Sequence, residues 1–305
     1  MHHITFIWTD EYLKYNFGPT HPFRSERGKV FLDKLSTQTV PFEYKISSPK
    51  KATDEDILLV HTLEYLKGVK RLYQEHKHLA LDTPLPEGIL EAAYYYVGGT
   101  ILASQLALKG ELTMNLLGGL HHAQTNHGGG FCIFNDHAIA IRKLRKQRSI
   151  TKAMILDLDV HAGNGTQEIF YSDPTVLTIS LHQDPNTLYP GTGFKEQIGE
   201  GPGKGFNINY PLPPGTKGQK YLKILDKALK HSSQFNPDIT YIILGVDTYK
   251  EDPLASLRLE EEDYQKIGLR LSDLCSRPLV ILCAGGYSPK VPDLWLKFLK
   301  GLTHP

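Results

Sequence analysis

The sequence has few cysteines, almost no excess charge and no long apolar run. Its three cysteines, Cys132, Cys275 and Cys283, form no CxxC pattern. Their spacing argues against a disulfide framework and suits a reducing compartment. No apolar run approaches the roughly 20 residues of a membrane-spanning helix. The opening residues, MHHITFIWTDEY, lack the charged and apolar regions of a signal peptide. We therefore expect a soluble, cytoplasmic protein with no membrane partner.

The charges are nearly balanced, because 34 Lys and Arg residues stand against 33 Asp and Glu residues and the formal net charge is +1. No global field would therefore attract nucleic acid. The densest basic run, RKLRKQR at 142–148, is expected to end a helix, where positive side chains complement the helix dipole. A nucleic-acid patch is the alternative interpretation of that run. The overall balance predicts no direct nucleic-acid binding.

Strand-like and helix-like segments alternate along the chain, which favours an α/β fold with a parallel sheet. The strand-like runs are continuously apolar in their middles, as expected when helices cover both faces of the sheet. Expected strands are 113–119, 152–160, 175–182, 238–245 and 278–286, and expected helices are 88–109, 135–148 and 221–235. Segments rich in glycine and proline at 184–193 and 199–215 are expected to be ordered loops. No linker or repeat divides the chain, so we expect one domain over residues 1–305.

Polar side chains follow four of the expected strands, at or just beyond the point where each strand ends. They are His121 and His122 after TMNLLGG, His161 after KAMILDLDV, Asp247 after DITYIILG and Tyr287 after PLVILCAGG. Ligands of open α/β sheets bind outside the carboxyl ends of the strands. We therefore expect these side chains to share one edge of the sheet.

The stretch ILDLDVHAGNG places Asp157, Asp159 and His161 at alternate positions. Side chains two residues apart on a strand point the same way, and adjacent buried carboxylates need a cation or hydrogen-bond donors to offset their charge. Each signal alone has an ordinary explanation, such as a hydrogen-bonded Asp-x-His pair or an N-cap role for Asp247. Together they favour a metal site whose three ligands leave positions for water and substrate.

Six segments resemble, in order, the motifs of the zinc-dependent histone deacetylases and their bacterial relatives. They are GGLHHAQTNHGGGFCIFND, DLDVHAGNGTQEIFY, TISLHQ, YPGTG, LGVDTYKEDPL and AGGYSP, and HPFRSERG and VHTLEYL extend the resemblance over nearly the whole chain. The resemblance implies a single arginase-like or deacetylase-like α/β domain with a central, mainly parallel sheet flanked by helices. It also implies a metal-dependent amidohydrolase that removes acetyl or other acyl groups from lysine side chains of peptides or proteins.

The resemblance further implies two metal sites. Asp159, His161 and Asp247 correspond to the ligands of the catalytic Zn²⁺, although the same ligand set would accept Fe²⁺ or Co²⁺. A structural potassium ion would be bound by Asp157, Asp159, His161, Ser180 and Leu181. This ion and His121 would offset the charge of Asp157.

Five residues correspond to the catalytic group of the family. They are His121, His122, Asp157, Asn164 and Tyr287. The resemblance implies that Asp157 orients His121 and that Asn164 orients His122, which would take a proton from the metal-activated water and later help to protonate the departing amine. Tyr287 would donate a hydrogen bond to the reacting carbonyl.

Two positions depart from the commonest family pattern. Ala162 stands where many members have a second histidine, and we expect no direct catalytic consequence. Asn164 stands where class I enzymes have aspartate, whereas class IV enzymes and several bacterial relatives also have asparagine there. The asparagine therefore brings the chain nearer to those groups.

Six further residues correspond to substrate-binding positions of the family. They are Arg27, Asp82, Gly130, Phe131, Tyr189 and Leu254. The resemblance implies that Phe131 and Tyr189 line an acyl-lysine tunnel and that Asp82 at its rim holds the substrate backbone. Arg27 corresponds to the arginine of an internal acetate channel. Leu254 occupies a position where polyamine-specific relatives tend to place a carboxylate, which favours acyl-lysine in a peptide or protein as the substrate.

Three alternatives stay open at this point. An acetylpolyamine amidohydrolase would use the same chemistry on a different substrate. A binuclear manganese ureohydrolase would share the fold, but Gly163 stands where the second metal would need a carboxylate. A non-catalytic acetyl-lysine binding scaffold would be expected to have lost a metal ligand or Tyr287.

Overall fold

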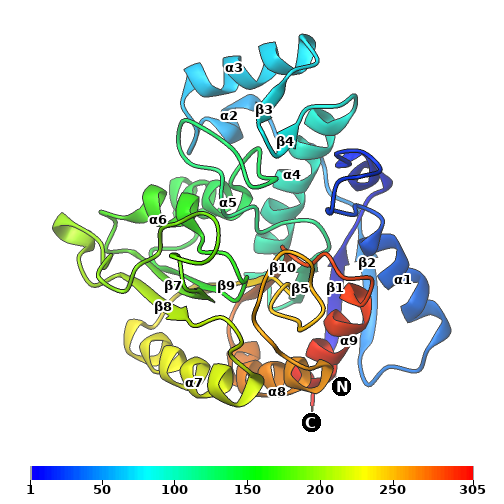
Figure 1. Cartoon of the computed structure of the whole chain (residues 1–305), viewed down its shortest axis with the longest axis vertical. Helices are drawn as coiled ribbons and strands as arrows, with labels where there is room; N and C mark the ends of the chain where they lie inside the picture. Colours follow the sequence, from blue (N-terminus) through cyan, green and yellow to red (C-terminus); the bar gives the residue numbers. More distant parts are fainter. Residues whose placement is uncertain (1, 305) are drawn as a thin grey trace.

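The computed structural model, which describes residues 2–304, contains a central eight-stranded sheet and a separate two-stranded hairpin (Figure 1). The sheet strands are β1 (His3–Ile7), β2 (Glu43–Ser47), β5 (Leu112–Asn115), β6 (Ala153–Asp157), β7 (Val176–Gln183), β8 (Asn207–Leu212), β9 (Ile239–Leu244) and β10 (Leu279–Cys283), and the hairpin strands are β3 (His78–Ala80) and β4 (Thr83–Pro84). The sheet has the order β2-β1-β5-β10-β9-β6-β7-β8, and every neighbouring pair in it is parallel. The prediction of a mainly parallel sheet is confirmed.

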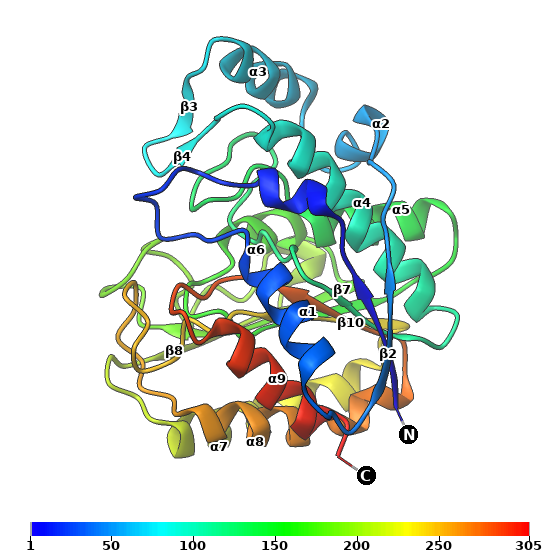
Figure 2. The same ribbon diagram turned by 90° about the vertical axis from the view of Figure 1, so that its right-hand side faces the viewer.

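Helices cover both faces of this sheet. The helices are α1 (Arg27–Thr37), α2 (Asp54–Ile57), α3 (Leu63–Gln74), α4 (Ile89–Ala107), α5 (Asp136–Lys146), α6 (Asn164–Phe170), α7 (Gly218–Phe235), α8 (Glu261–Leu271) and α9 (Val291–Leu302), and the 3₁₀ turns are η1 (Asp10–Lys14), η2 (Gly201–Gly203) and η3 (Ser272–Ser276). Helices α1, α7, α8 and α9 lie on one face and α4, α5 and α6 on the other, with α2, α3 and the hairpin beyond α4 (Figures 1 and 2). Among the described residues, no helix combines the length and the apolar character that a bilayer span requires.

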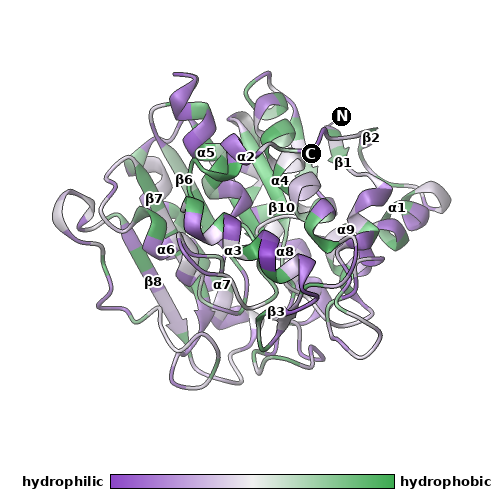
Figure 3. Ribbon diagram, turned by 90° about the horizontal axis from the view of Figure 1, so that it is seen from above, coloured by the Kyte–Doolittle hydropathy of each residue, from purple (hydrophilic) through white to green (hydrophobic). Residues whose placement is uncertain are grey.

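The central strands are buried along their whole length, because helices cover both of their faces. Every residue of β6, β7, β9 and β10 is buried. Figure 3 shows β7 and β10 mainly in the hydrophobic colour, whereas β8 at the edge is largely hydrophilic. The continuously apolar runs that predicted these inner strands thus match their position in a doubly covered parallel sheet.

The segment 199–215 was expected to be a loop, and this prediction is wrong for its second half. Residues 207–212 form β8, which pairs with β7 along its length. The sequence NINYPL does not indicate a strand, because asparagine and proline are rare in strands. Both are tolerated here because an edge strand does not need every N–H group for pairing. Gln167 Oε1 accepts hydrogen bonds from the side chains of Asn207 and Asn209.

Candidate active site

The parallel sheet brings the predicted site residues to one edge. His121 and His122 follow β5, His161 follows β6, Asp247 follows β9, and Tyr287 follows β10. Because these strands are parallel neighbours in the order β5-β10-β9-β6, their carboxyl ends lie side by side. The predicted convergence of polar groups at this edge is confirmed.

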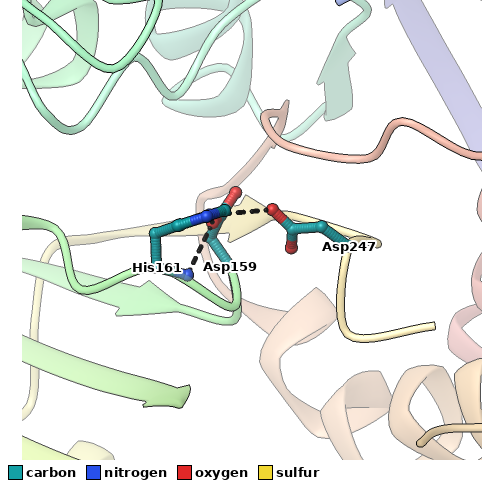
Figure 4. Close-up of side chains that lie close together, drawn as sticks. All are labelled: Asp159, His161 and Asp247. Atoms are coloured by element: carbon teal, nitrogen blue, oxygen red, sulfur yellow. Dashed lines mark hydrogen bonds and ion pairs between the residues drawn. The ribbon is translucent and has the colours of Figure 1, made fainter. Parts of the chain in front are cut away.

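Three buried side chains meet in a geometry suited to a metal ion. Asp159, His161 and Asp247 each offer one ligand atom, and these atoms lie within 4.8 Å of one another. His161 Nδ1 lies 3.1 Å from Asp159 Oδ1 and 3.2 Å from Asp247 Oδ2. Figure 4 shows the two carboxylates turned toward the imidazole from separate loops. One nitrogen and two carboxylate oxygens therefore surround a common point.

The surroundings of this triad favour a cation. Burial and the neighbouring charge of Asp159 raise the pKa of Asp247 to about 8, since two adjacent buried carboxylates resist ionising together. A Cβ atom at Gly285 would lie only 2.1 Å from Asp247 Oδ2. A Cβ atom at Gly245 would lie 2.3 Å from Asp159 Oδ2. Glycine at both positions leaves room for the paired carboxylates, and a divalent cation would offset their charge. The residues present therefore fit a metal ion.

The two adjacent histidines have separate orienting partners. His121 Nδ1 lies 2.7 Å from Asp157 Oδ2, and His122 Nδ1 lies 2.7 Å from Asn164 Oδ1. The two rings meet through their Nε2 atoms at 3.1 Å. Both pairs are the ones expected from the sequence. Because Asn164 Oδ1 can only accept a hydrogen bond, His122 carries its proton on Nδ1, and its Nε2 keeps a lone pair that faces His121 Nε2.

The same contacts separate the charge states of the two rings. Burial disfavours the charged form of His121, but the negative charges of Asp157 and Asp159 outweigh burial and raise its pKa to about 9. Burial and the positive charges of His121 and His161 hold the pKa of His122 well below its usual value. His121 is therefore the cationic member of the pair, and His122 is the neutral member that can accept a proton.

Aromatic rings lie beside the histidines and Tyr287. The ring of Phe131 lies 5.7 Å from that of Tyr287, and the ring of Tyr189 lies 5.0 Å from that of His122. Gly130 has a φ of +57°, and a Cβ atom there would lie 2.5 Å from His122 Cδ2. Glycine therefore lets the backbone approach the imidazole closely, which brings Phe131 beside the site.

Asp82, which was predicted to lie at the rim of the substrate tunnel, has a structural contact that the sequence did not predict. Both of its carboxylate oxygens accept a hydrogen bond from Gly130 N, at 3.2 and 3.1 Å. Thr83 Oγ1 accepts from Phe131 N at 3.0 Å. His21 Nε2 lies 3.2 Å from the carbonyl oxygen of Asp82, and its ring lies 4.3 Å from that of Phe131. The hairpin loop of β3 and β4 thus holds the turn that carries Phe131.

The remaining predicted residues lie around the same edge. Arg27 is buried and donates to the carbonyl oxygens of Cys283, Ala284 and Gly286, so it supports the segment before Tyr287.

Leu254 is half-buried in the loop after β9. The cation-site candidates Ser180 and Leu181 are buried in β7, next to β6, and Ser180 pairs with Asp157 in the sheet register.

One further residue near the histidines escaped the sequence analysis. Asp136 is completely buried at the start of α5. Its Oδ1 accepts from Leu120 N at 2.8 Å, and its Oδ2 accepts from Gly119 N at 2.9 Å. Asp136 therefore anchors the chain just before His121. It lies within a quoted motif, but its backbone partners left no pattern in the sequence that could reveal its role.

The fold and the site together define a class: parallel α/β domains with a candidate metal centre of two aspartates and one histidine at the carboxyl edge of the sheet. The chain belongs to the histone deacetylase family, because the family described as "Histone deacetylase domain" matches residues 21–302. A "Probable deacetylase" from Archaeoglobus fulgidus is 38% identical, covering 92% of this chain and 80% of that protein. The protein is therefore a hydrolytic deacetylase of this family, as the resemblance implied.

Two solved structures have the same fold. A histone deacetylase homologue from Aquifex aeolicus has a TM-score of 0.88 and 29% identity, covering 98% of this chain and 84% of that chain. An acetylpolyamine aminohydrolase from Burkholderia pseudomallei has a TM-score of 0.86 and 25% identity, covering 99% of both chains.

Proposed function

We propose that this deacetylase removes acetyl or other acyl groups from lysine side chains in peptides or proteins. The observation that carries the proposal is the position of two aromatic rings beside the site, with Phe131 5.7 Å from Tyr287 and Tyr189 5.0 Å from His122 between ring centres. These rings would enclose the uncharged methylene stem of lysine, and burial of apolar area contributes about 25 cal/mol per Å². A polyamine ammonium beside Leu254 would lose hydration without gaining a charged partner.

Asp159, His161 and Asp247 would hold the catalytic metal, which we propose is Zn²⁺, with Fe²⁺ or Co²⁺ as alternatives. When bound, the metal supplies polarisation of the amide carbonyl and a lowered pKa for water. His122 takes the proton of the attacking water at Nε2 and returns it to the departing amine. Tyr287 donates its hydroxyl proton to a hydrogen bond with the developing oxyanion. The products are a free amine and a carboxylate.

We also propose a structural potassium ion at Asp157, Asp159, His161, Ser180 and Leu181. Its support is the hydrogen bonding of Ser180. His182 Nε2 lies 2.8 Å from Gly193 O, a pure acceptor, so His182 carries its proton there. His182 Nδ1 therefore accepts from Ser180 Oγ, 2.8 Å away. With its proton committed to His182, Ser180 Oγ offers only lone pairs to its other neighbours, as a cation ligand must.

The substrate assignment predicts a preference that kinetics can measure. We expect kcat/KM for an acetyl-lysine peptide to exceed the values for acetylspermidine and acetylputrescine. Leu254→Glu should shift this ratio toward the polyamines, because the new carboxylate would meet their ammonium groups. Leu269→Glu, at an exposed position of α8, is the matched control and should leave the ratio unchanged. If either polyamine is preferred by about tenfold or more, a difference of roughly 1.4 kcal/mol, the enzyme is an acetylpolyamine amidohydrolase and the assignment is wrong.

The contact between Asn164 and His122 predicts a shift in pH dependence. Asn164→Asp would place a negative charge beside His122 Nδ1 and raise the pKa of His122, since a carboxylate favours the imidazolium form. The unprotonated base would then be present only at higher pH, so the acid limb of the kcat/KM profile should move upward. Asn126→Asp adds the same charge at an exposed position and should not move the limb. An unmoved limb in Asn164→Asp would contradict the role of His122 as the base.

A further inference from the structure

A buried carboxylate joins the two loops that follow β9 and β10. Asp252 lies in the loop after β9 and is only 6% exposed. Its Oδ2 accepts from Tyr287 N at 2.8 Å, across 35 residues of sequence, and its Oδ1 accepts from Leu254 N at 3.0 Å. The Asp252 side chain therefore binds the backbone of Tyr287, the proposed oxyanion donor. It also binds the backbone of Leu254, which is proposed to lie beside the substrate.

The segment that leads to Tyr287 has two further anchors. Gly285 N donates to Asp159 Oδ2 at 2.8 Å, and Gly286 O accepts from Arg27 Nη1 at 3.0 Å. Gly286 follows with a φ of +134°, a conformation that only glycine adopts readily. Gly286 O and Tyr287 N belong to one planar peptide group, so Arg27 and Asp252 together fix the peptide that carries Tyr287.

We propose that Asp252 is a positioning residue that fixes Tyr287 for donation to the reacting carbonyl and ties this tyrosine to the loop of Leu254. The inference rests on the proposed role of Tyr287. A carboxylate is required because both of its oxygens accept hydrogen bonds, whereas asparagine offers one acceptor and turns an N–H group toward the second backbone N–H. Asp252 acts through Tyr287 and does not itself contact the substrate.

The test is a double-mutant cycle on the metal-loaded enzyme with an acetyl-lysine peptide. Asp252→Asn should lower kcat by about tenfold or more, because a displacement near 1 Å can cost about 10²-fold in rate. In a Tyr287→Phe background the same change should lower kcat by less than about twofold, since coupled residues do not add. The metal content, measured by elemental analysis, should stay at the wild-type level in all four proteins.

The matched control is Asp263→Asn. Asp263 is 7% exposed and also accepts a backbone N–H, that of Glu260 at 2.9 Å, but it lies at the start of α8. Its loss should lower the melting temperature and leave kcat near the wild-type value. If the Asp252→Asn variant does not fold, Asp252→Glu is used in its place in the cycle. Glutamate keeps both acceptor oxygens, but its longer side chain displaces the backbone N–H groups of Tyr287 and Leu254 that they bind.

Three results would overturn the proposal. They are a wild-type kcat in the folded Asp252 variant, an equal kcat loss from Asp252→Asn in both backgrounds, and an equal kcat loss in the Asp263 control. A different result would count against the proposed function instead. If Tyr287→Phe alone retained full activity, Tyr287 would not be the oxyanion donor, whatever Asp252 does.

Discussion

Replacing Asp159 by Asn, or His161 by Ala, is expected to abolish deacetylation and to lower the bound metal content in the same step. Both side chains are buried and supply two of the three atoms that lie within 4.8 Å of one another. An amide is a neutral and weaker ligand than a carboxylate, and alanine supplies no ligand atom, so neither variant completes the site. Turnover of an acetyl-lysine peptide and elemental analysis of the same preparation measure the two effects.

The control for these variants is Asp226→Asn, which changes an exposed carboxylate of α7 paired with Arg270. It should retain both metal and activity. Full metal occupancy in the Asp159 and His161 variants would show that other residues bind the metal. Loss of activity with full occupancy would leave these side chains a catalytic role but reject their assignment as ligands.

Tyr287→Phe is expected to reduce kcat by roughly 10²-fold or more, the usual loss when one oxyanion donor is removed. The fold and the metal content should be preserved, because phenylalanine keeps the ring that packs 5.7 Å from the ring of Phe131. The backbone bond from Tyr287 N to Asp252 does not depend on the hydroxyl group. The measurements are kcat and a melting curve on one sample.

The opposite pattern would reject this role for Tyr287. If the phenol only packs, Tyr287→Phe should lower the melting temperature while turnover stays near normal. The control is Tyr65→Phe, which removes a buried hydroxyl that donates to Ile133 O at 2.7 Å. That variant should lose stability, because the carbonyl oxygen would lose its partner, without a comparable loss of kcat.

The inner strands and the residues at their ends could be predicted because their signals are local. Largely apolar runs such as ITYIIL predicted buried parallel strands, and Asp247 lies three residues beyond the end of this one. The edge strand β8 was missed because its asparagines and proline suit an edge but not a central strand. Strands β1 and β2 were not among the expected strands either, and β2 is exposed at four of its five residues.

The contacts missed in the site have a common physical cause. Asp136, Asp252 and Asp82 all accept hydrogen bonds from backbone N–H groups elsewhere in the chain. A backbone donor is present at almost every residue, so it leaves no mark in the sequence. Side-chain pairs such as His121 with Asp157 were predicted because both partners belong to recognisable motifs.

The strand order has a consequence for how the chain is made. Strand β10 lies between β5 and β9, and it alone joins the ladder β2-β1-β5 to the ladder β9-β6-β7-β8. Val280 of β10 pairs with Thr113 of β5, so this contact cannot form until residues 279–283 have left the ribosome. Before then the nascent protein has two partial ladders with open strand edges that can pair wrongly. Tyr287 follows β10, so the site is completed only after β10 has been made.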